Sequence, residues 1–577
     1  MSETDERGFE QFEKFLEGWS RRDFLQRVGG AAAFTAFMGG GAAFLEACGG
    51  TTPAGKDTGK VVKGGKLIYS SISDIKNMNP VLQNDTASRL INDRIHDSLV
   101  TLDEQGTLVP LIAKAGPVVS DGGLTLTYKL NTNVTFTDGH PLTSDDVKFT
   151  YDLSFDPKYK DVLSQSRSTY EEYVQEFQAP DPATFVVKLK KVYAPIVTDF
   201  GKSGIVPKHV LANLSGKEIN SADYNSNPTV TSGPFKFVEW KKGQQVTLAA
   251  NEKYWRGRPN LDTFIYLVVG STLDGLNKLQ TGEVDIAGID LSQADKAKTL
   301  TNIDLISFAG FSYDYIAFNI RDDKPAGKLF KDKAVRQAML YAIDREAIKN
   351  AIYFGYATIA DSVEPPLSWA FNKDVKTKYS FDKKKAESLL DGAGWVKGAD
   401  GIRAKGGVKM SFEIITNAGN KNRENLILAL SQAWKDVGMD AKTNFVDFNK
   451  VLVPALLNNR NFDVAMSGLS VGTDPDIDQY HTRNISPGNF NSPGYSSPQA
   501  DKLIDDAVAT LDKAKRKDLY FQLQNVLAED PTQPPLFFAK GLTGISKRVK
   551  GYKFSPYLST NSGARYFMKD VYVSDGK

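Results

Sequence analysis

The stretch from Thr231 to Ile289 constrains the fold more than any other part of the chain. Period-two alternation of apolar residues predicts strands around Phe235–Phe237 and Val246–Leu248. The apolar run Phe264–Val269 predicts a buried strand, and leucines at helical spacing predict a short helix over Leu273–Leu279. Strands and a helix that follow one another so closely favour an α/β unit.

Length and charge limit the classes of protein to consider. A chain of 577 residues needs two or more hydrophobic cores. A formal net charge of +2 predicts neither a nucleic-acid partner nor binding to a membrane surface. Cys48 is the single cysteine, which excludes an intramolecular disulfide and a thiolate metal cluster.

The N-terminal residues carry the pattern of an export signal. Arg21 and Arg22 precede the uncharged stretch Val28–Leu45, and a small residue stands before Cys48. The pattern resembles a twin-arginine signal (1–47) joined to a lipoprotein box, in which Cys48 would carry the lipid. Gln26 and Glu46 depart from that pattern, and an uncleaved membrane anchor is the alternative. Residues 48–65 are rich in Gly, Thr and Lys, which predicts a flexible linker.

Two further segments predict regular structure with defined ends. Leu124–Leu130 alternates after an Asp-Gly turn, and a second such turn at Asp138 predicts a hairpin. Thr143–Val147 opens a helix, because its hydroxyl and carboxylate groups satisfy the free N–H groups of the first turn. We therefore interpret Asp138 and Asp145 as turn and cap residues.

The second part of the chain also alternates strands with helices. Phe311–Ile320 predicts an aromatic-rich strand, and Phe330–Gly355 predicts two helices separated at Asp344. A helix over Arg423–Val437 lies between the strands predicted for 410–415 and 462–466. This alternation indicates a second α/β lobe.

Several motifs resemble those of the family 5 solute-binding proteins, the extracytoplasmic receptors of ATP-binding-cassette importers for peptides, nickel and some oligosaccharides. Thr231–Ile289 contributes Gly233-Pro234, Tyr254-Trp255 and the turn-like Thr281–Asp285. The remaining motifs follow in family order: Ser120–Leu153, YIAFN, VRQAMLYAIDREAI, AESLLDGAGW and YSSPQADKLIDDAVATLD.

The resemblance implies an α/β fold of the two-lobed periplasmic-binding-protein type (type II, large three-subdomain form). Lobe 1 would comprise 66–98, 220–310 and 540–577, with a subdomain inserted over 99–219. Lobe 2 would comprise 311–539. We expect chain crossings near Tyr315–Asn319 and Pro535–Ala539.

The resemblance also implies function. We expect a monomeric, lipid-anchored receptor that traps a solute by hinge closure and delivers it to the permease and ATPase subunits of an importer. An oligopeptide is the first expectation for the ligand, and an oligosaccharide or a metal chelate is the alternative. No cofactor and no catalysis are expected. An exported hydrolase with paired carboxylates and a sensory lipoprotein are the rival classes.

Three loops supply the candidate ligand-binding residues. The loop Ser71–Pro80 follows a predicted strand, although its polar residues also suit a turn without a ligand. Glu364–Ala370 carries Trp369, a candidate for stacking on a solute or for the core. The resemblance implies that Leu469–Tyr480, with its Asp-Pro pair, borders the cleft between the lobes. The candidates are Ser73, Asp74, Asn77, Trp369, Asp474, Asp476 and Tyr480. Peptide-binding relatives place an Asp for the peptide amine shortly before the Asp-Pro pair, whereas Leu469–Gly472 contains no acid.

Metal binding is not expected from residue spacing. The four histidines (His96, His140, His209 and His481) are scattered and match no ligand motif. The acids of Asp474–Asp478 begin like a calcium loop, but Gln479 and Ile485 stand where that loop needs glycine and glutamate. We therefore predict no metal site.

Overall fold

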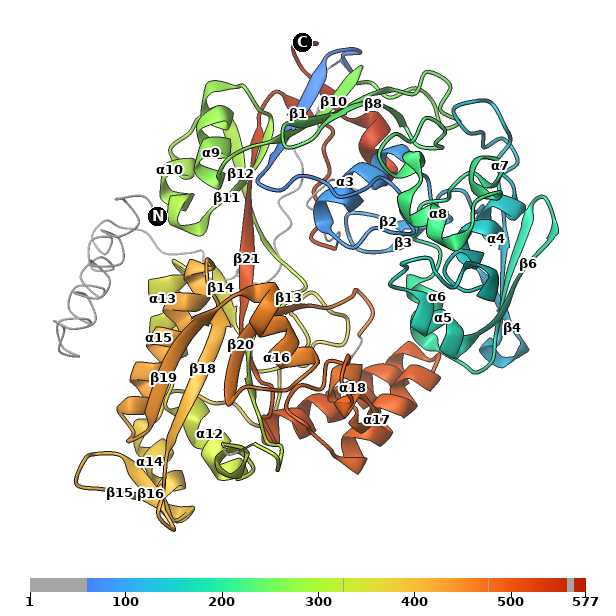
Figure 1. Ribbon diagram of the computed structural model, residues 1–577. Coiled ribbons are helices and arrows are strands. Elements are labelled where there is room, and N and C mark those ends of the chain that lie inside the picture. Colours follow the sequence, from blue (N-terminus) through green and yellow to red (C-terminus); the bar gives the residue numbers. More distant parts are fainter. Residues whose placement is uncertain (1–59, 325, 476, 558–564) are drawn as a thin grey trace, which may run out of the picture. The chain divides into compact units, whose positions relative to one another are not determined.

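The computed structural model describes residues 60–577 except 325, 476 and 558–564 (Figure 1). The predicted signal residues Arg21 and Arg22, the predicted lipidation site Cys48 and the candidate Asp476 lie outside the described residues. Among the residues that the structure describes, no helix combines the length and the apolar character needed to cross a membrane.

A 12-stranded mixed sheet organises the described chain. Its main path runs in the order β19 (Asp440–Val446), β18 (Ser411–Asn417), β20 (Val464–Ser470), β13 (Ser312–Phe318), β21 (Pro535–Ser546), β11 (Ile286–Ile289), β1 (Lys66–Ser71), β10 (Thr263–Val268), β9 (Gln245–Ala250) and β8 (Phe235–Lys241). Two further strands, β12 (Ile303–Ala309) and β14 (Ala357–Ile359), pair with β21 outside this path. Strand β21 stands near the middle of the path and is drawn as one long arrow in Figure 1. Up to Ala539 it pairs with β13 and β14, and from Lys540 onward with β11 and β12. One continuous strand therefore belongs to two half-sheets.

The first half-sheet is built around β1, which pairs in parallel with β10 and β11. Phe264 and Tyr266 of β10 are buried in its core. The strands and the helix predicted within Thr231–Ile289 are confirmed. The elements of this half are β1 (Lys66–Ser71), α3 (Thr86–Ile95), β8 (Phe235–Lys241), β9 (Gln245–Ala250), β10 (Thr263–Val268), α9 (Thr272–Thr281), β11 (Ile286–Ile289), α10 (Ala294–Lys298), β12 (Ile303–Ala309), β22 (Val549–Lys550) and β23 (Tyr572–Val573).

The motif residues of the first half have structural roles. Gly282 ends α9 in a left-handed conformation with φ of 80°, which favours glycine. Asp285, almost fully buried, accepts hydrogen bonds from the Ile68 N–H (2.8 Å) and from the Arg548 guanidinium. The Tyr254 hydroxyl and the Trp255 indole both donate to the buried carboxylate of Asp97, at 3.1 and 2.7 Å. These contacts bind the motif residues of Thr231–Ile289 to other parts of the first half.

Residues 99–219 contain a separate four-stranded sheet in the order β4-β5-β7-β6, and we call them the inserted region. The capped helix is confirmed, because the Thr143 N–H donates to Asp146 at 2.9 Å and α4 begins at Ser144. The elements are β2 (Val100–Leu102), β3 (Leu108–Pro110), β4 (Val118–Ser120), β5 (Thr125–Lys129), α4 (Ser144–Asp152), α5 (Arg167–Tyr173), β6 (Val174–Asp181), β7 (Thr184–Leu189), α6 (Ala194–Asp199), α7 (Lys208–Leu211) and α8 (Gly216–Ser221).

The second half-sheet contains the parallel pairs β18–β19 and β18–β20, with helices packed on it. The helix break predicted at Asp344 is confirmed: this side chain caps α13 by accepting from the Ala347 N–H at 3.0 Å. The elements are β13 (Ser312–Phe318), α11 (Gly327–Phe330), α12 (Lys333–Tyr341), α13 (Arg345–Ile352), β14 (Ala357–Ile359), α14 (Lys383–Gly392), β15 (Val396–Lys397), β16 (Arg403–Lys405), β17 (Val408–Lys409), β18 (Ser411–Asn417), α15 (Lys421–Lys435), β19 (Asp440–Val446), α16 (Val453–Leu457), β20 (Val464–Ser470), α17 (Pro498–Ala509) and α18 (Lys513–Glu529).

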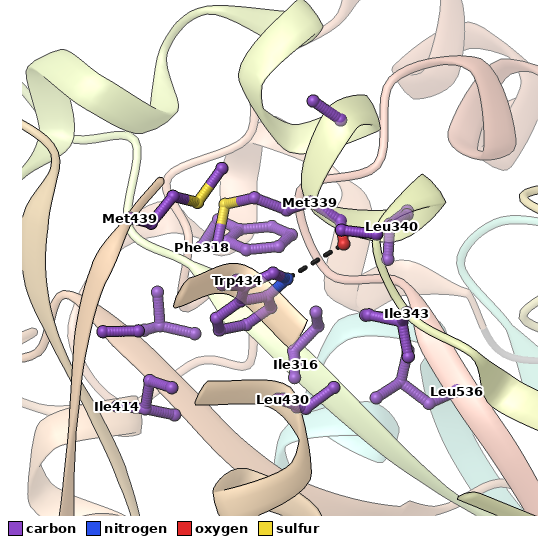
Figure 2. Packing of buried hydrophobic residues seen from close by; sticks show 14 of the residues in the cluster. Ile316, Phe318, Met339, Leu340, Ile343, Ile414, Leu430, Trp434, Met439 and Leu536 are labelled. Atoms are coloured by element: carbon purple, nitrogen blue, oxygen red, sulfur yellow. Dashed lines mark hydrogen bonds between the residues drawn. The ribbon is translucent and has the colours of Figure 1, made fainter. Parts of the chain in front are cut away.

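The largest fully buried side chain in the core of the second half is Trp434 on α15. It is completely buried, and its indole N–H donates to the Met339 carbonyl at 2.9 Å (Figure 2). The rings of Phe318 and Phe412 lie 6.3 and 5.8 Å from it, centroid to centroid. Through these contacts, Trp434 packs α12 and α15 against the sheet.

Candidate functional site

The loop Ser71–Pro80 follows β1 and is held by hydrogen bonds within the first half. Asp74 accepts from the Trp240 indole N–H (3.1 Å) and from the Gly243 N–H (2.7 Å), so it fixes the turn between β8 and β9. Asn77 accepts from the Asn79 N–H at 3.1 Å. The Ser73 carbonyl accepts from the Tyr266 hydroxyl at 2.6 Å, and this serine is exposed. Of the three candidates in this loop, Ser73 is the most accessible to a solute.

The other two candidate loops meet on α18, in the second half. Trp369 packs edge-on against Tyr520, with ring centroids 5.9 Å apart. The Arg516 guanidinium lies 5.2 Å from the Trp369 ring and also binds the carboxylate of Asp474. The structure therefore brings Trp369 and Asp474 together through Arg516, although they are 105 residue positions apart in the sequence.

The pair formed by Asp474 and Arg516 is buried and bidentate. The two hydrogen bonds measure 2.6 and 3.0 Å, and the side chains are only 1% and 4% exposed. Burial alone would lower the pKa of Arg516, but the hydrogen bonds and charge of Asp474 raise it. Tyr520 donates to the Pro475 carbonyl at 3.0 Å. The carboxylate of Asp474 thus orders its own loop, and its charge is already balanced.

Tyr480 and its neighbours form a buried polar layer beside this pair. The Tyr480 hydroxyl donates to the Gln533 carbonyl at 2.6 Å, and burial raises its pKa well above the usual range. The Gln479 amide donates to the Tyr313 hydroxyl at 3.3 Å. Glu364 is 1% exposed and adds to the raised pKa of Tyr313, after burial and Tyr315.

A small cavity of about 30 Å³ lies between Tyr480, Arg345, Gln524 and Gln533. Its volume suits a single water molecule rather than a solute of several heavy atoms. We therefore place no solute in it.

Contacts between the inserted region and the second half involve residues that the sequence analysis did not identify. The Lys202 ammonium donates to the Thr473 hydroxyl at 3.3 Å, across 271 residues of sequence. Arg483 lies close enough to Tyr173 and Glu172 to affect the pKa of both, although burial is the largest influence on each. No local pattern could have indicated these contacts, because the partners belong to distant segments.

A second polar cluster lies where β13 leaves the shared strand. Asp314 is opposite Phe537 of β21, and its carboxylate accepts from Arg423 (3.0 Å) and from the Tyr353 hydroxyl (2.8 Å). A side chain at Gly468 would collide with the Arg423 guanidinium, since a Cβ there would lie 2.0 Å from it. The glycine on β20 therefore makes room for this arginine next to the carboxyl end of β18, the kind of sheet edge at which α/β proteins bind ligands.

Solved structures share this architecture. The oligopeptide-binding protein AppA from Bacillus subtilis, in complex with a nonapeptide, aligns with a TM-score of 0.75 and 31% identity over 89% of this chain and 100% of that chain. NikZ from Campylobacter jejuni, in complex with Ni(L-His), aligns with a TM-score of 0.73 and 26% identity over 88% and 99%. The fold is therefore the two-lobed periplasmic-binding-protein fold expected from the sequence.

Sequence comparison defines the family. The family model described as "Bacterial extracellular solute-binding proteins, family 5 Middle" matches residues 107–492. The oligopeptide-binding protein AppA of Bacillus subtilis (strain 168) is 33% identical over 520 residues, which cover 89% of this chain and 94% of that protein. The chain belongs to the family 5 bacterial extracellular solute-binding proteins.

Proposed function

We propose that this protein is the extracytoplasmic receptor of an ATP-binding-cassette importer and that its solute is an oligopeptide. One observation carries the proposal: the chain resembles an oligopeptide-binding protein over nearly the full length of both proteins, including its structure with a bound nonapeptide. The protein would work by binding and release without catalysis, and as a monomer that meets the permease and ATPase subunits.

The shared strand supports a hinge mechanism. The chain passes between the half-sheets at Ala309–Ser312, and the segment Tyr315–Asn319, where the sequence led us to expect this crossing, lies in and just after β13 of the second half. The chain passes back within β21, where the pairing partners change between Ala539 and Lys540. Two short connections of this kind allow lobes to rotate as rigid bodies. Lobe 1 would comprise 66–98, 220–310 and 540–577, with the subdomain 99–219, and lobe 2 would comprise 311–539. The contact of Lys202 with Thr473 would form on closure, which a solute drives by touching both lobes.

In the three candidate loops, some residues would contact the peptide and others would hold the loops in shape. Ser73 is the one exposed candidate among the described residues, and Trp369 is half-buried with its ring against Tyr520. Asp74, Asn77 and Tyr480 would shape the loops that hold the solute. Asp474 already balances Arg516, so a peptide amine would need another partner, and Asp476 remains a candidate. We therefore propose that the peptide is held chiefly through its backbone.

Thermal unfolding of the purified protein tests this function. Peptides of two to nine residues should raise the melting temperature, and a peptide at 100 times its dissociation constant should stabilise the fold by about 2.7 kcal/mol. N-acetylated versions should stabilise equally, because the Leu469–Gly472 segment contains no carboxylate and the peptide backbone would supply the main contacts. Weaker stabilisation by the acetylated peptides would instead assign the amine to Asp476. Oligosaccharides and the nickel–histidine complex are tested in the same way for comparison. The nickel complex is included because the chain is similar in structure to NikZ.

The outcomes separate the alternatives. Stabilisation by the nickel complex or by oligosaccharides, without any effect of peptides, would replace the proposed ligand class. Cleavage of the peptides during incubation, measured by mass spectrometry, would contradict the receptor function and favour an exported hydrolase. Ligand binding without an importer partner in a pull-down would favour a sensory lipoprotein.

We also propose that the protein is exported through the signal containing Arg21 and Arg22 and anchored by lipid on Cys48. A Cys48→Ala variant should then move from the membrane fraction to the soluble fraction after cell lysis. Its control is an Arg21→Lys/Arg22→Lys variant, which should remain in the cytoplasm because a signal of this type depends on both arginines. A Cys48→Ala protein that stays with the membrane would contradict lipid anchoring and favour an uncleaved anchor.

A further inference from the structure

Three side chains of the inserted region converge, although the sequence spacing did not indicate a site. The His140 Nδ1 and the His209 Nε2 lie 3.0 and 2.8 Å from the same oxygen, Oδ2 of Asp138. One potential ligand atom from each of the three residues lies within 4.8 Å of the others. Two imidazoles and one carboxylate thus face one another.

A turn and a helix together position the three side chains. Asp138 and His140 belong to one turn, in which Gly139 adopts φ of 93° and the Phe136 N–H donates to the His140 carbonyl at 2.9 Å. His209 comes from α7, and its ring packs edge-on against the buried ring of Phe136, with centroids 5.5 Å apart. Turn and helix are therefore joined through Phe136, and the ligand atoms need little movement to meet a common ion.

The donor set and its spacing fit a transition-metal ion. At metal–ligand distances of 2.0–2.1 Å, donor atoms at two corners of a tetrahedron are separated by about 3.3 Å. The two nitrogen–oxygen separations of 3.0 and 2.8 Å are close to this value. Imidazole and carboxylate ligands suit zinc, nickel and copper. The two imidazole rings stack with centroids 4.2 Å apart, which brings one nitrogen of each ring to the same side of the cluster as Asp138 Oδ2.

We propose that Asp138, His140 and His209 bind a divalent transition-metal ion, with Zn²⁺ as the expected occupant. The side chains of the three residues are 27%, 61% and 31% exposed, so the ion can enter from solvent. Three protein ligands leave at least one coordination position for water or for a ligand from another molecule. The site lies in none of the three candidate loops and does not depend on the proposed peptide ligand.

Calorimetric titration of the metal-free purified protein with Zn²⁺ tests this site. The protein should bind one zinc ion through the cluster, and His140→Gln and Asp138→Asn should each weaken that binding at least about tenfold. Asp145→Asn is the matched control: this carboxylate is 65% exposed, lies in the same region and pairs with Lys208, so its loss should leave zinc affinity unchanged. Co²⁺ should give a visible absorption spectrum that the His140→Gln variant lacks.

Three results would overturn the proposal. The first is the absence of zinc binding at micromolar concentrations. The second is equal affinity in the parent and the His140→Gln variant, whose mostly exposed side chain can change without disturbing the fold. The third is loss of binding in a His481→Gln variant alone, which would place the ion beside Asp501 and Asp505 in the second half.

Discussion

Replacing Asp474 by Ala is expected to lower the free energy of unfolding by about 3–5 kcal/mol, because Arg516 would keep its charge in a buried site without its partner. Both carboxylate oxygens of Asp474 accept from the guanidinium, and neither side chain is more than 4% exposed. The same change would release the loop that carries Pro475 and Tyr480. Urea denaturation followed by circular dichroism measures the loss.

Two comparison variants test whether the loss comes from the unpaired buried charge. Asp506→Ala removes an exposed partner of Lys502 and should change stability by no more than about 0.5 kcal/mol. The double variant Asp474→Leu/Arg516→Met removes both charges and should recover most of the loss. If Asp474→Ala proved as mild as Asp506→Ala, the pair would not stabilise the lobe. If the stable double variant lost peptide affinity, Asp474 would contact the ligand as well.

Replacing Trp434 by Ala is expected to cost about 3–5 kcal/mol, the range for large-to-small changes at fully buried aromatic sites. The indole fills the space between α12, α15 and the sheet, and its removal would also leave the Met339 carbonyl without its donor (Figure 2). The midpoint of chemical denaturation measures this loss.

Phe448→Ala serves as the control for that experiment. Phe448 is 44% exposed, so its truncation should cost far less than the loss of Trp434. Similar losses for the two variants would contradict the assignment of Trp434 as the centre of this core. A loss confined to one of two unfolding transitions would show that the lobes unfold separately.

Local sequence patterns predicted the elements of the fold well. The strands and helix within Thr231–Ile289, the capped helix after Thr143 and the break at Asp344 all occur where alternation and capping residues place them. These features depend on neighbours within a few residues, which is the range over which periodicity and capping act.

The candidate site was predicted less completely, because its contacts join distant segments. Nothing local indicates that Arg516 lies between Trp369 and Asp474, or that Lys202 reaches Thr473. Histidines 69 residue positions apart likewise gave no spacing pattern, although the fold brings His140 and His209 to one carboxylate. Such pairs follow from the arrangement of whole elements, which local pattern does not encode.

The strand shared by the two half-sheets also has a consequence for synthesis. Strands β11 and β12 are made early, but their partner β21 leaves the ribosome only after residues 313–534, which contain the rest of the second half. All the helices of the second half are therefore synthesised before the first half can close its sheet. Until then the edges of β11 and β12 are open to wrong pairing, a hazard of contacts so distant along the chain. Holding the nascent chain until residue 546 has emerged would protect these edges.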